Sequence, residues 1–292
     1  MGDERKVVYS ELFKNTLDFL AAGRDLDEQI RCINETGNHA PTWLLRSALL
    51  SSIGLATPKQ SAENFLVFGC YIPFMAIPEL QASIKLLNLT DIDYTYSPDK
   101  EVCCGAPIWE DTVELVDMED ERRKEIQSKC KGFMEMNNSL GKKAQAANMI
   151  YMCHNCASLA RRTFNEDKSH HLWIYDLLVD RLHDRALEIE PATYGYYKGC
   201  HRHFPSISNL GWKTYREFLG GIKGLTLIDL NNKQCCREDA VPILKEAVEK
   251  GVKEIIVPCG DGNYQLHLAS QAANIPMKQK SLSSLLLDAL ER

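Results

Sequence analysis

Cysteine is the residue type whose number and spacing carry the chemistry of this sequence. The chain has 292 residues and 11 cysteines, and Cys103 and Cys104 are adjacent in the stretch EVCCGAPIWE. Adjacent thiols do not easily form a disulfide with each other, and tetrahedral zinc usually takes its ligands from spaced pairs. The charged start MGDERKVVYS lacks the apolar core of a signal peptide, so we expect a cytoplasmic protein. In that reducing compartment, many cysteines indicate metal or redox chemistry.

Most of the cysteines follow an order that occurs twice along the chain. In each half, a cysteine after a strand-like run precedes an adjacent pair, and a further cysteine closes another strand-like run. The first half contributes Cys70, Cys103, Cys104, Cys153 and Cys156, and the second half contributes Cys200, Cys235, Cys236 and Cys259. The remaining two, Cys32 and Cys130, lie in predicted helical segments, and we expect them to be inert or buried thiols. The order indicates an internal duplication.

The segments between these cysteines predict strands that alternate with helices. In the first half, residues 65–69 and 91–97 have strand patterns, and an amphipathic helical stretch follows Pro73. In the second half we expect strands at 193–198, 225–230 and 254–258, and helices at 206–220 and 238–250. This alternation predicts an α/β fold with a small parallel sheet in each half. Ligands of such sheets lie beyond the carboxyl ends of the strands, which is where every repeated cysteine falls.

Three regions result from this pattern. Residues 1–62 predict an N-terminal helical extension, with Leu12, Leu17 and Leu20 in one helical segment and PTWLLRSALLSSIGL in another. Residues 63–191 form the first predicted domain, which carries a helical insertion after residue 110, and residues 192–292 form the second. No apolar stretch reaches the roughly 20 residues that span a bilayer. The formal net charge of −6 gives no indication of nucleic-acid binding.

The cysteine sets suit soft metal centres, either zinc or an iron–sulfur cluster. The first set has five thiols, one more than tetrahedral zinc takes, and an adjacent pair suits neighbouring irons of one cluster. These two observations favour iron–sulfur in the first half. The second set has four cysteines, so zinc stays open there.

The order of a cysteine, a Cys-Cys-Gly and a Cys-x-x-Cys resembles the CCG domain. Two such domains in tandem, over residues 64–292, are similar to the B subunit of heterodisulfide reductase, including its variants in sulfur oxidisers. The resemblance implies a non-cubane [4Fe–4S] cluster held by Cys70, Cys103, Cys104, Cys153 and Cys156. It implies a second cluster held by Cys200, Cys235, Cys236 and Cys259.

The second half departs from the family pattern. Gly262 stands where the family has its closing cysteine, and Arg237 replaces the glycine after the second pair. The second site is therefore expected to hold a conventional [4Fe–4S] cluster, an altered cluster or zinc. Asp261 is either an oxygen ligand or a solvated loop residue.

Three histidines lie next to the cysteines and are candidate proton donors. His154 lies between Cys153 and Cys156, and His201 and His203 follow Cys200. Each either donates a proton to sulfur or packs without a chemical role.

The resemblance implies an iron–sulfur oxidoreductase that acts on a disulfide, a thiol or a sulfur-carrier substrate. Its expected partners are the ferredoxin-like C subunit and the flavin-containing A subunit of such a reductase, because the chain has no recognisable flavin or nicotinamide site. The N-terminal residues faintly resemble the C subunit without its cysteine runs, and are expected to be a docking surface or a helical cap. Two alternatives stay open: an electron-transfer subunit of a succinate, fumarate, lactate or glycolate oxidoreductase, and a zinc-stabilised scaffold.

Overall fold

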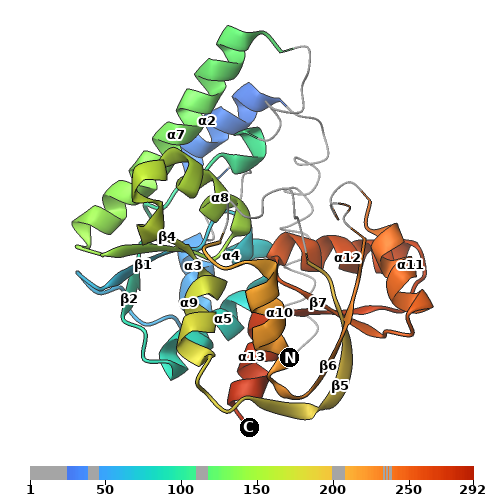
Figure 1. Cartoon of the computed structure of the whole chain (residues 1–292). Helices are drawn as coiled ribbons and strands as arrows, with labels where there is room; N and C mark the ends of the chain where they lie inside the picture. The colour runs from blue at the N-terminus through green and yellow to red at the C-terminus, as the bar shows by residue number, and fades with distance from the viewer. Residues whose placement is uncertain are drawn as a thin grey trace.

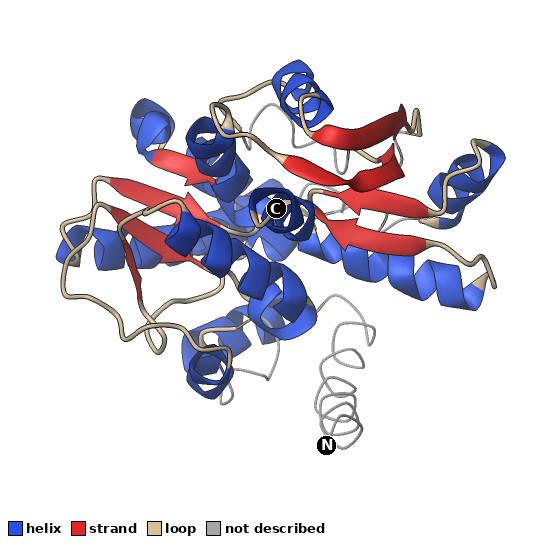
Figure 2. Cartoon of the chain, turned by 90° about the horizontal axis from the view of Figure 1, so that it is seen from below, coloured by secondary structure: helices blue, strands red, loops and turns tan. Residues whose placement is uncertain are grey.

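The chain forms two four-stranded sheets in which every strand pair is parallel. The computed structural model describes residues 25–38, 46–109, 118–198, 208–232, 234, 236 and 239–292. The first sheet contains β1 (Asn64–Val67), β2 (Tyr94–Tyr96), β3 (Asn148–Tyr151) and β4 (His171–Trp173). The second sheet contains β5 (Glu188–Tyr196), β6 (Lys223–Asp229), β7 (Glu254–Val257) and β8 (Lys278–Ser281). The predicted α/β fold is confirmed (Figure 2).

The two sheets share one strand order, which makes the duplication visible in three dimensions. The first sheet runs β2-β1-β3-β4 and the second runs β6-β5-β7-β8. The outer strands β4 and β8 are absent from the sequence-based expectation. β4 has only three residues and β8 has the polar sequence KQKS, so neither shows the apolar run that marks a buried strand.

Helices of the first half pack around the first sheet and bury its central strand. They are α4 (Ile72–Met75), α5 (Ile77–Leu89), α7 (Asp120–Lys143), α8 (His154–Thr163) and α9 (Ile174–Leu182). All four residues of β1 are buried, as expected for a parallel strand covered on both faces. Where one helix was expected after Pro73, the structure has two. Ala76 has a non-helical backbone conformation that ends α4, and Pro78 lies in the first turn of α5, where proline is favoured. The predicted helical insertion is confirmed by α7.

The second half repeats this plan, with four helices in the residues that the structure describes. They are α10 (Trp212–Gly220), α11 (Val241–Glu249), α12 (Gly260–Ala272) and α13 (Leu282–Leu290). α10 and α11 lie within the helices predicted at 206–220 and 238–250. α12 begins directly after Cys259 at the end of β7, just as α8 begins after Cys153 at the end of β3.

Among the described residues before the first sheet, two helices contribute to its core. α2 (Leu26–Thr36) starts at Asp25, whose side chain accepts a hydrogen bond from the Glu28 backbone at 3.0 Å, and α3 (Arg46–Ser52) follows. Ile33 and Leu50 are each 1% exposed and pack in the main hydrophobic cluster. Leu12, Leu17 and Leu20 lie outside the described residues. The predicted domain boundaries at residues 62 and 191 stay predictions.

The two halves meet along a seam formed by helices from both. α5 packs against α13, and α4 packs against α12 (Figure 1). The buried hydroxyls of Ser83 and Ser283 lie 2.6 Å apart across this seam. Within the part of the chain that the structure describes, no helix has the length and apolar character needed to cross a membrane.

Candidate metal centre

The first cysteine set gathers at the carboxyl ends of the first three strands. Cys70 follows β1, the pair Cys103 and Cys104 follows β2, and Cys153 follows β3 and precedes α8, which carries Cys156. Because β1 lies between β2 and β3 in the sheet, these strand ends are neighbours. The topology therefore brings together thiols that are far apart in the sequence.

The sulfur atoms of this set form a continuous chain of contacts. The Sγ atoms of Cys70 and Cys103 lie 3.2 Å apart, as do those of Cys104 and Cys156. Cys103 also contacts Cys104, and Cys156 contacts Cys153. All five cysteines are free thiols. Within the described residues, no three His, Cys, Asp or Glu side chains are grouped closely enough to hold a single metal ion.

Burial and mutual contact favour the protonated form of Cys70, Cys104 and Cys156. Cys103, Cys104 and Cys156 are at most 2% exposed, whereas Cys70 and Cys153 are half-buried. The pKa of Cys70 is raised well above its usual range, first by its hydrogen bond to Cys103 and then by burial. The pKa values of Cys104 and Cys156 are raised in the same way, first by hydrogen bonds from neighbouring cysteines. A bound cationic centre would reverse this balance, because thiolates bind metals as their protons leave. The donor set therefore fits a thiolate-held metal centre.

A buried ion pair fixes the loops that carry the first cysteines. Glu101 accepts hydrogen bonds from the backbone N–H groups of Phe68 at 3.1 Å and Gly69 at 2.7 Å, and its side chain is fully buried. Arg46, from α3, pairs with Glu101 and donates to the Gly69 carbonyl at 3.0 Å. Burial raises the pKa of Glu101, and Arg46 opposes that shift. The pair thereby joins the loop before Cys70 to the loop before Cys103.

Backbone and amide contacts complete this support. The Cys103 N–H donates to the Gly37 carbonyl at 2.6 Å, so the end of α2 holds the cysteine pair directly. The buried side chain of Asn137, from α7, bonds both backbone groups of Val102, at 2.9 Å and 2.7 Å. No sequence pattern marks Arg46, Glu101 or Asn137, because each acts through a contact distant in the chain.

At two positions next to the cysteines, backbone conformation and close packing favour glycine over any residue with a side chain. Gly69 has a φ of +77°, and a Cβ there would lie 3.1 Å from Cys153 Cβ and 3.3 Å from Cys156 Sγ. Gly105 has a φ of +74°, and a Cβ there would lie 2.9 Å from Cys130 Sγ. Cys130 is fully buried beneath the cysteine pair and outside the sulfur chain, and burial raises its pKa to about 12. The expectation of an inert, buried thiol fits this environment, as it does for the buried Cys32 on α2.

The described part of the second cysteine set consists of Cys236 and Cys259. Both are 8% exposed, and Cys259 starts α12, where its Sγ accepts a hydrogen bond from the Gly262 N–H at 3.4 Å. Cys200, Cys235, His201 and His203 lie outside the described residues, and so does the side chain of Asp261. A Cβ on Gly262 would lie 3.5 Å from Cys236 Sγ and 3.7 Å from Cys259 Cβ. Position 262 therefore faces the two described thiols of this set.

We expect Gly262→Cys to add a thiol to the second set. Its Cβ would also lie 2.8 Å from Val257 Cγ1, so the single variant is strained and the double variant Gly262→Cys/Val257→Ala relieves the clash. The double variant should raise the bound metal or change the absorption spectrum relative to Val257→Ala alone. Identical metal content and spectra in these two proteins would place position 262 away from the metal.

His154 connects the two cysteine sets. Its Nδ1 lies 3.1 Å from Cys259 Sγ, although the two residues are 105 positions apart. His154 is 8% exposed and begins α8 between Cys153 and Cys156. Of the three histidines expected near the cysteines, it is the one that the described residues place at a thiol. The imidazole can exchange a proton with Cys259 and lies beside the first set.

Comparison with known proteins identifies the first of these sets. Residues 66–159 match the family model of the cysteine-rich CCG domain, and this span contains all five cysteines of the first set. No curated protein matches the sequence. The match is confined to residues 66–159, and the repetition of the first sheet's strand order in the second half is a finding of the structure.

Proposed function

We propose that this chain is an iron–sulfur oxidoreductase component, similar to the B subunit of heterodisulfide reductase, that acts on a disulfide or thiol. The observation that carries this proposal is the contact of His154 with Cys259, which sets the two cysteine groups against one another across the seam. A substrate that joins two sulfur atoms suits a site with thiols on two sides.

The first set would hold a non-cubane [4Fe–4S] cluster through Cys70, Cys103, Cys104, Cys153 and Cys156. When bound, such a cluster supplies one-electron redox chemistry and iron sites with affinity for sulfur. Five contiguous thiols exceed what a four-coordinate zinc ion uses, which supports a cluster. Cys236 and Cys259, with Cys200 and Cys235, would hold the second centre, whose metal is a conventional or altered cluster or zinc.

The chain's own residues contribute burial, orientation and proton transfer. Reduction of a disulfide breaks the S–S bond and consumes two electrons and two protons, giving two thiols. His154 Nδ1 lies at hydrogen-bond distance from a thiol of the second set and can supply one of these protons. The half-buried Cys70 and Cys153 form the accessible edge of the first set, whereas Cys103, Cys104 and Cys156 are shielded from water.

The electrons are proposed to come from or go to other proteins in the cytoplasm. The proposed partners are subunits of the ferredoxin-like C type and the flavin-containing A type. A substrate of this reaction is a small disulfide, a thiol or a sulfur-carrier protein.

Metal analysis of the full chain, purified without oxygen, tests the proposal first. We expect several iron atoms and matching acid-labile sulfide per chain. About two zinc ions with negligible iron would contradict it and would favour the zinc-stabilised scaffold.

Titration of the oxidised and reduced protein with small disulfides and thiols is the second test. We expect the paramagnetic signal of the first site to change when a sulfur compound binds. A signal that no disulfide or thiol alters would favour the electron-transfer role in a succinate, fumarate or lactate-type oxidoreductase.

A further inference from the structure

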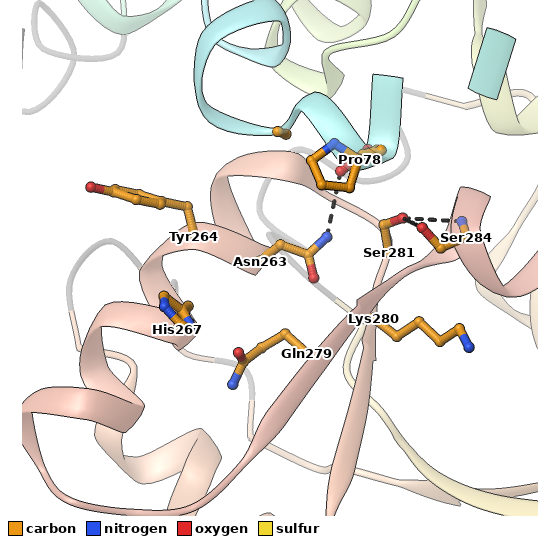
Figure 3. A pocket seen from close by; sticks show the side chains of 10 residues that line it. Pro78, Asn263, Tyr264, His267, Gln279, Lys280, Ser281 and Ser284 are labelled. Carbon is orange, nitrogen blue, oxygen red and sulfur yellow. Dashed lines mark hydrogen bonds between the residues drawn. The ribbon is translucent and has the colours of Figure 1, made fainter. Parts of the chain in front are cut away.

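A pocket on the seam between the two halves has no cysteine in its lining. Its volume is about 310 Å³, and it opens between the start of α5, the first turns of α12 and strand β8 (Figure 3). Ala76 and Pro78 line it from the first half, and Asn263, Tyr264 and Ser281 line it from the second. The pocket therefore has walls from both halves.

A buried carboxylate without a cationic partner forms part of the wall. Glu79 is 4% exposed, and within the described residues it makes no ion pair. Its Oε1 accepts a hydrogen bond from the Tyr175 hydroxyl at 3.1 Å, and that hydroxyl accepts one from Ser283 at 2.9 Å. Its Oε2 accepts one from Asn263 Nδ2 at 3.4 Å. Burial raises the pKa of Glu79 to about 7, because the ionised carboxylate is desolvated and has no countercharge to stabilise it.

A second acceptor in the pocket has no partner. Because Asn263 uses its Nδ2 for Glu79, its Oδ1 remains, and this atom is buried with no hydrogen bond to any described residue. Figure 3 shows this oxygen on the side of the Asn263 amide that faces Gln279. A buried unsatisfied acceptor is costly and indicates a missing donor.

The basic side chains that line the pocket are directed elsewhere. Lys280 pairs with Asp288, and its amine also lies 5.7 Å from the ring centroid of Tyr194. Figure 3 shows its amine pointing away from the pocket. His267 bonds Gln271 at 3.0 Å on the exposed face of α12. The lining residues therefore supply neither a positive charge for the Glu79 carboxylate nor a hydrogen-bond donor for Asn263 Oδ1.

We propose that this seam pocket binds a small organic molecule through a protonated primary amine. The ammonium carries three N–H donors and a positive charge, which match the Glu79 carboxylate and Asn263 Oδ1. Ala76, Pro78 and Tyr264 offer apolar surface for the body of the ligand. An anionic ligand is disfavoured, because it would meet Glu79 without a compensating cation.

The occupant would also contact the start of α12. A Cβ on Gly260 would lie 3.1 Å from Glu79 Oε2, and the Asn263 N–H donates to the Cys259 carbonyl at 3.0 Å. The pocket is thus one helical turn from Cys259. Binding in it requires no metal in either cysteine set, so the proposal stands independently of the proposed function.

Isothermal titration calorimetry of the full chain with 2-phenylethylamine tests this pocket, in a buffer that contains no amine. We expect measurable binding of the amine, and at least about tenfold weaker binding of its neutral isostere 2-phenylethanol and of the anion 3-phenylpropionate. Glu79→Gln, which keeps the shape of the side chain, should weaken amine binding about tenfold or more. The matched control Glu249→Gln, at an exposed position on α11 outside the pocket, should leave it unchanged.

Three results would overturn the proposal. They are equal binding of the alcohol and the amine, amine binding unaffected by Glu79→Gln, and equal loss in Glu249→Gln. A thermal melt shows whether Glu79→Gln is folded. If it is not, Asn263→Leu removes the free acceptor at a partly exposed position, and full amine affinity in that variant equally refutes the site.

Discussion

Replacing Cys103 or Cys104 with alanine should remove most of the metal from the first site. Both thiols are buried in the middle of the sulfur chain, so either substitution separates Cys70 from Cys156. We expect each variant purified without oxygen to lose the iron of the first site, and to retain only the metal held by the second. Iron and acid-labile sulfide per chain are the measurements.

Cys130→Ala is the matched control for this loss. Cys130 is as deeply buried as Cys103 and lies next to Gly105, but it stands outside the sulfur chain. Its removal should leave the iron content unchanged, although it creates a small cavity that lowers thermal stability. Full iron content in both Cys103→Ala and Cys104→Ala would refute the ligand assignment. A Cys130→Ala protein as iron-poor as these variants would show that any loss of packing there releases the metal.

Arg46→Met should destabilise the chain by about 3–5 kcal/mol, because it leaves the buried charge of Glu101 uncompensated. The expected result is a large fall in the apparent melting temperature of the metal-free chain. Adding Glu101→Gln to Arg46→Met removes the isolated charge, so the double variant should recover part of the loss. A double variant no more stable than Arg46→Met would mean that Glu101 is not ionised in the folded protein.

The exposed ion pair between Lys59 and Asp93 provides the comparison. Its side chains are 58% and 46% exposed, so Lys59→Met should change the stability by less than about 1 kcal/mol. Equal effects of Arg46→Met and Lys59→Met would contradict the structural role assigned to the buried pair.

The sequence predicted the cysteine sites through the strands that carry them. In a parallel sheet, the carboxyl ends of all strands lie at the same edge. A cysteine that directly follows an apolar strand is therefore predicted to lie at that edge, even when the rest of the fold is unknown. The structure places the cysteines of the first set at neighbouring strand ends, with Sγ contacts between them. The sequence did not predict β4 and β8, because one is short and the other is polar. Each forms a strand through pairing with its neighbour, β3 or β7, and its own composition does not favour a strand.

Contacts between distant residues were beyond the sequence. Glu101 is next to the cysteine pair in EVCCG, yet its burial depends on Arg46, which is 55 positions away. His154 was expected to lie near sulfur because it is between two cysteines. Its contact with Cys259 in the other half follows only from the packing of α4, α5, α12 and α13 along the seam.

Because α2 and α3 are attached to the cysteine loops, they belong to the segment that is needed to keep the first cysteine set in place. The matched CCG span begins at residue 66, but the carbonyl that holds Cys103 belongs to Gly37 and the cation that neutralises Glu101 belongs to Arg46. Cutting the chain at the edge of the recognisable motif would remove a backbone acceptor and a countercharge from the motif's interior. The matched span is therefore shorter than the segment that holds these cysteines in place, and transplanting the site into another protein requires the longer segment, which includes α2 and α3.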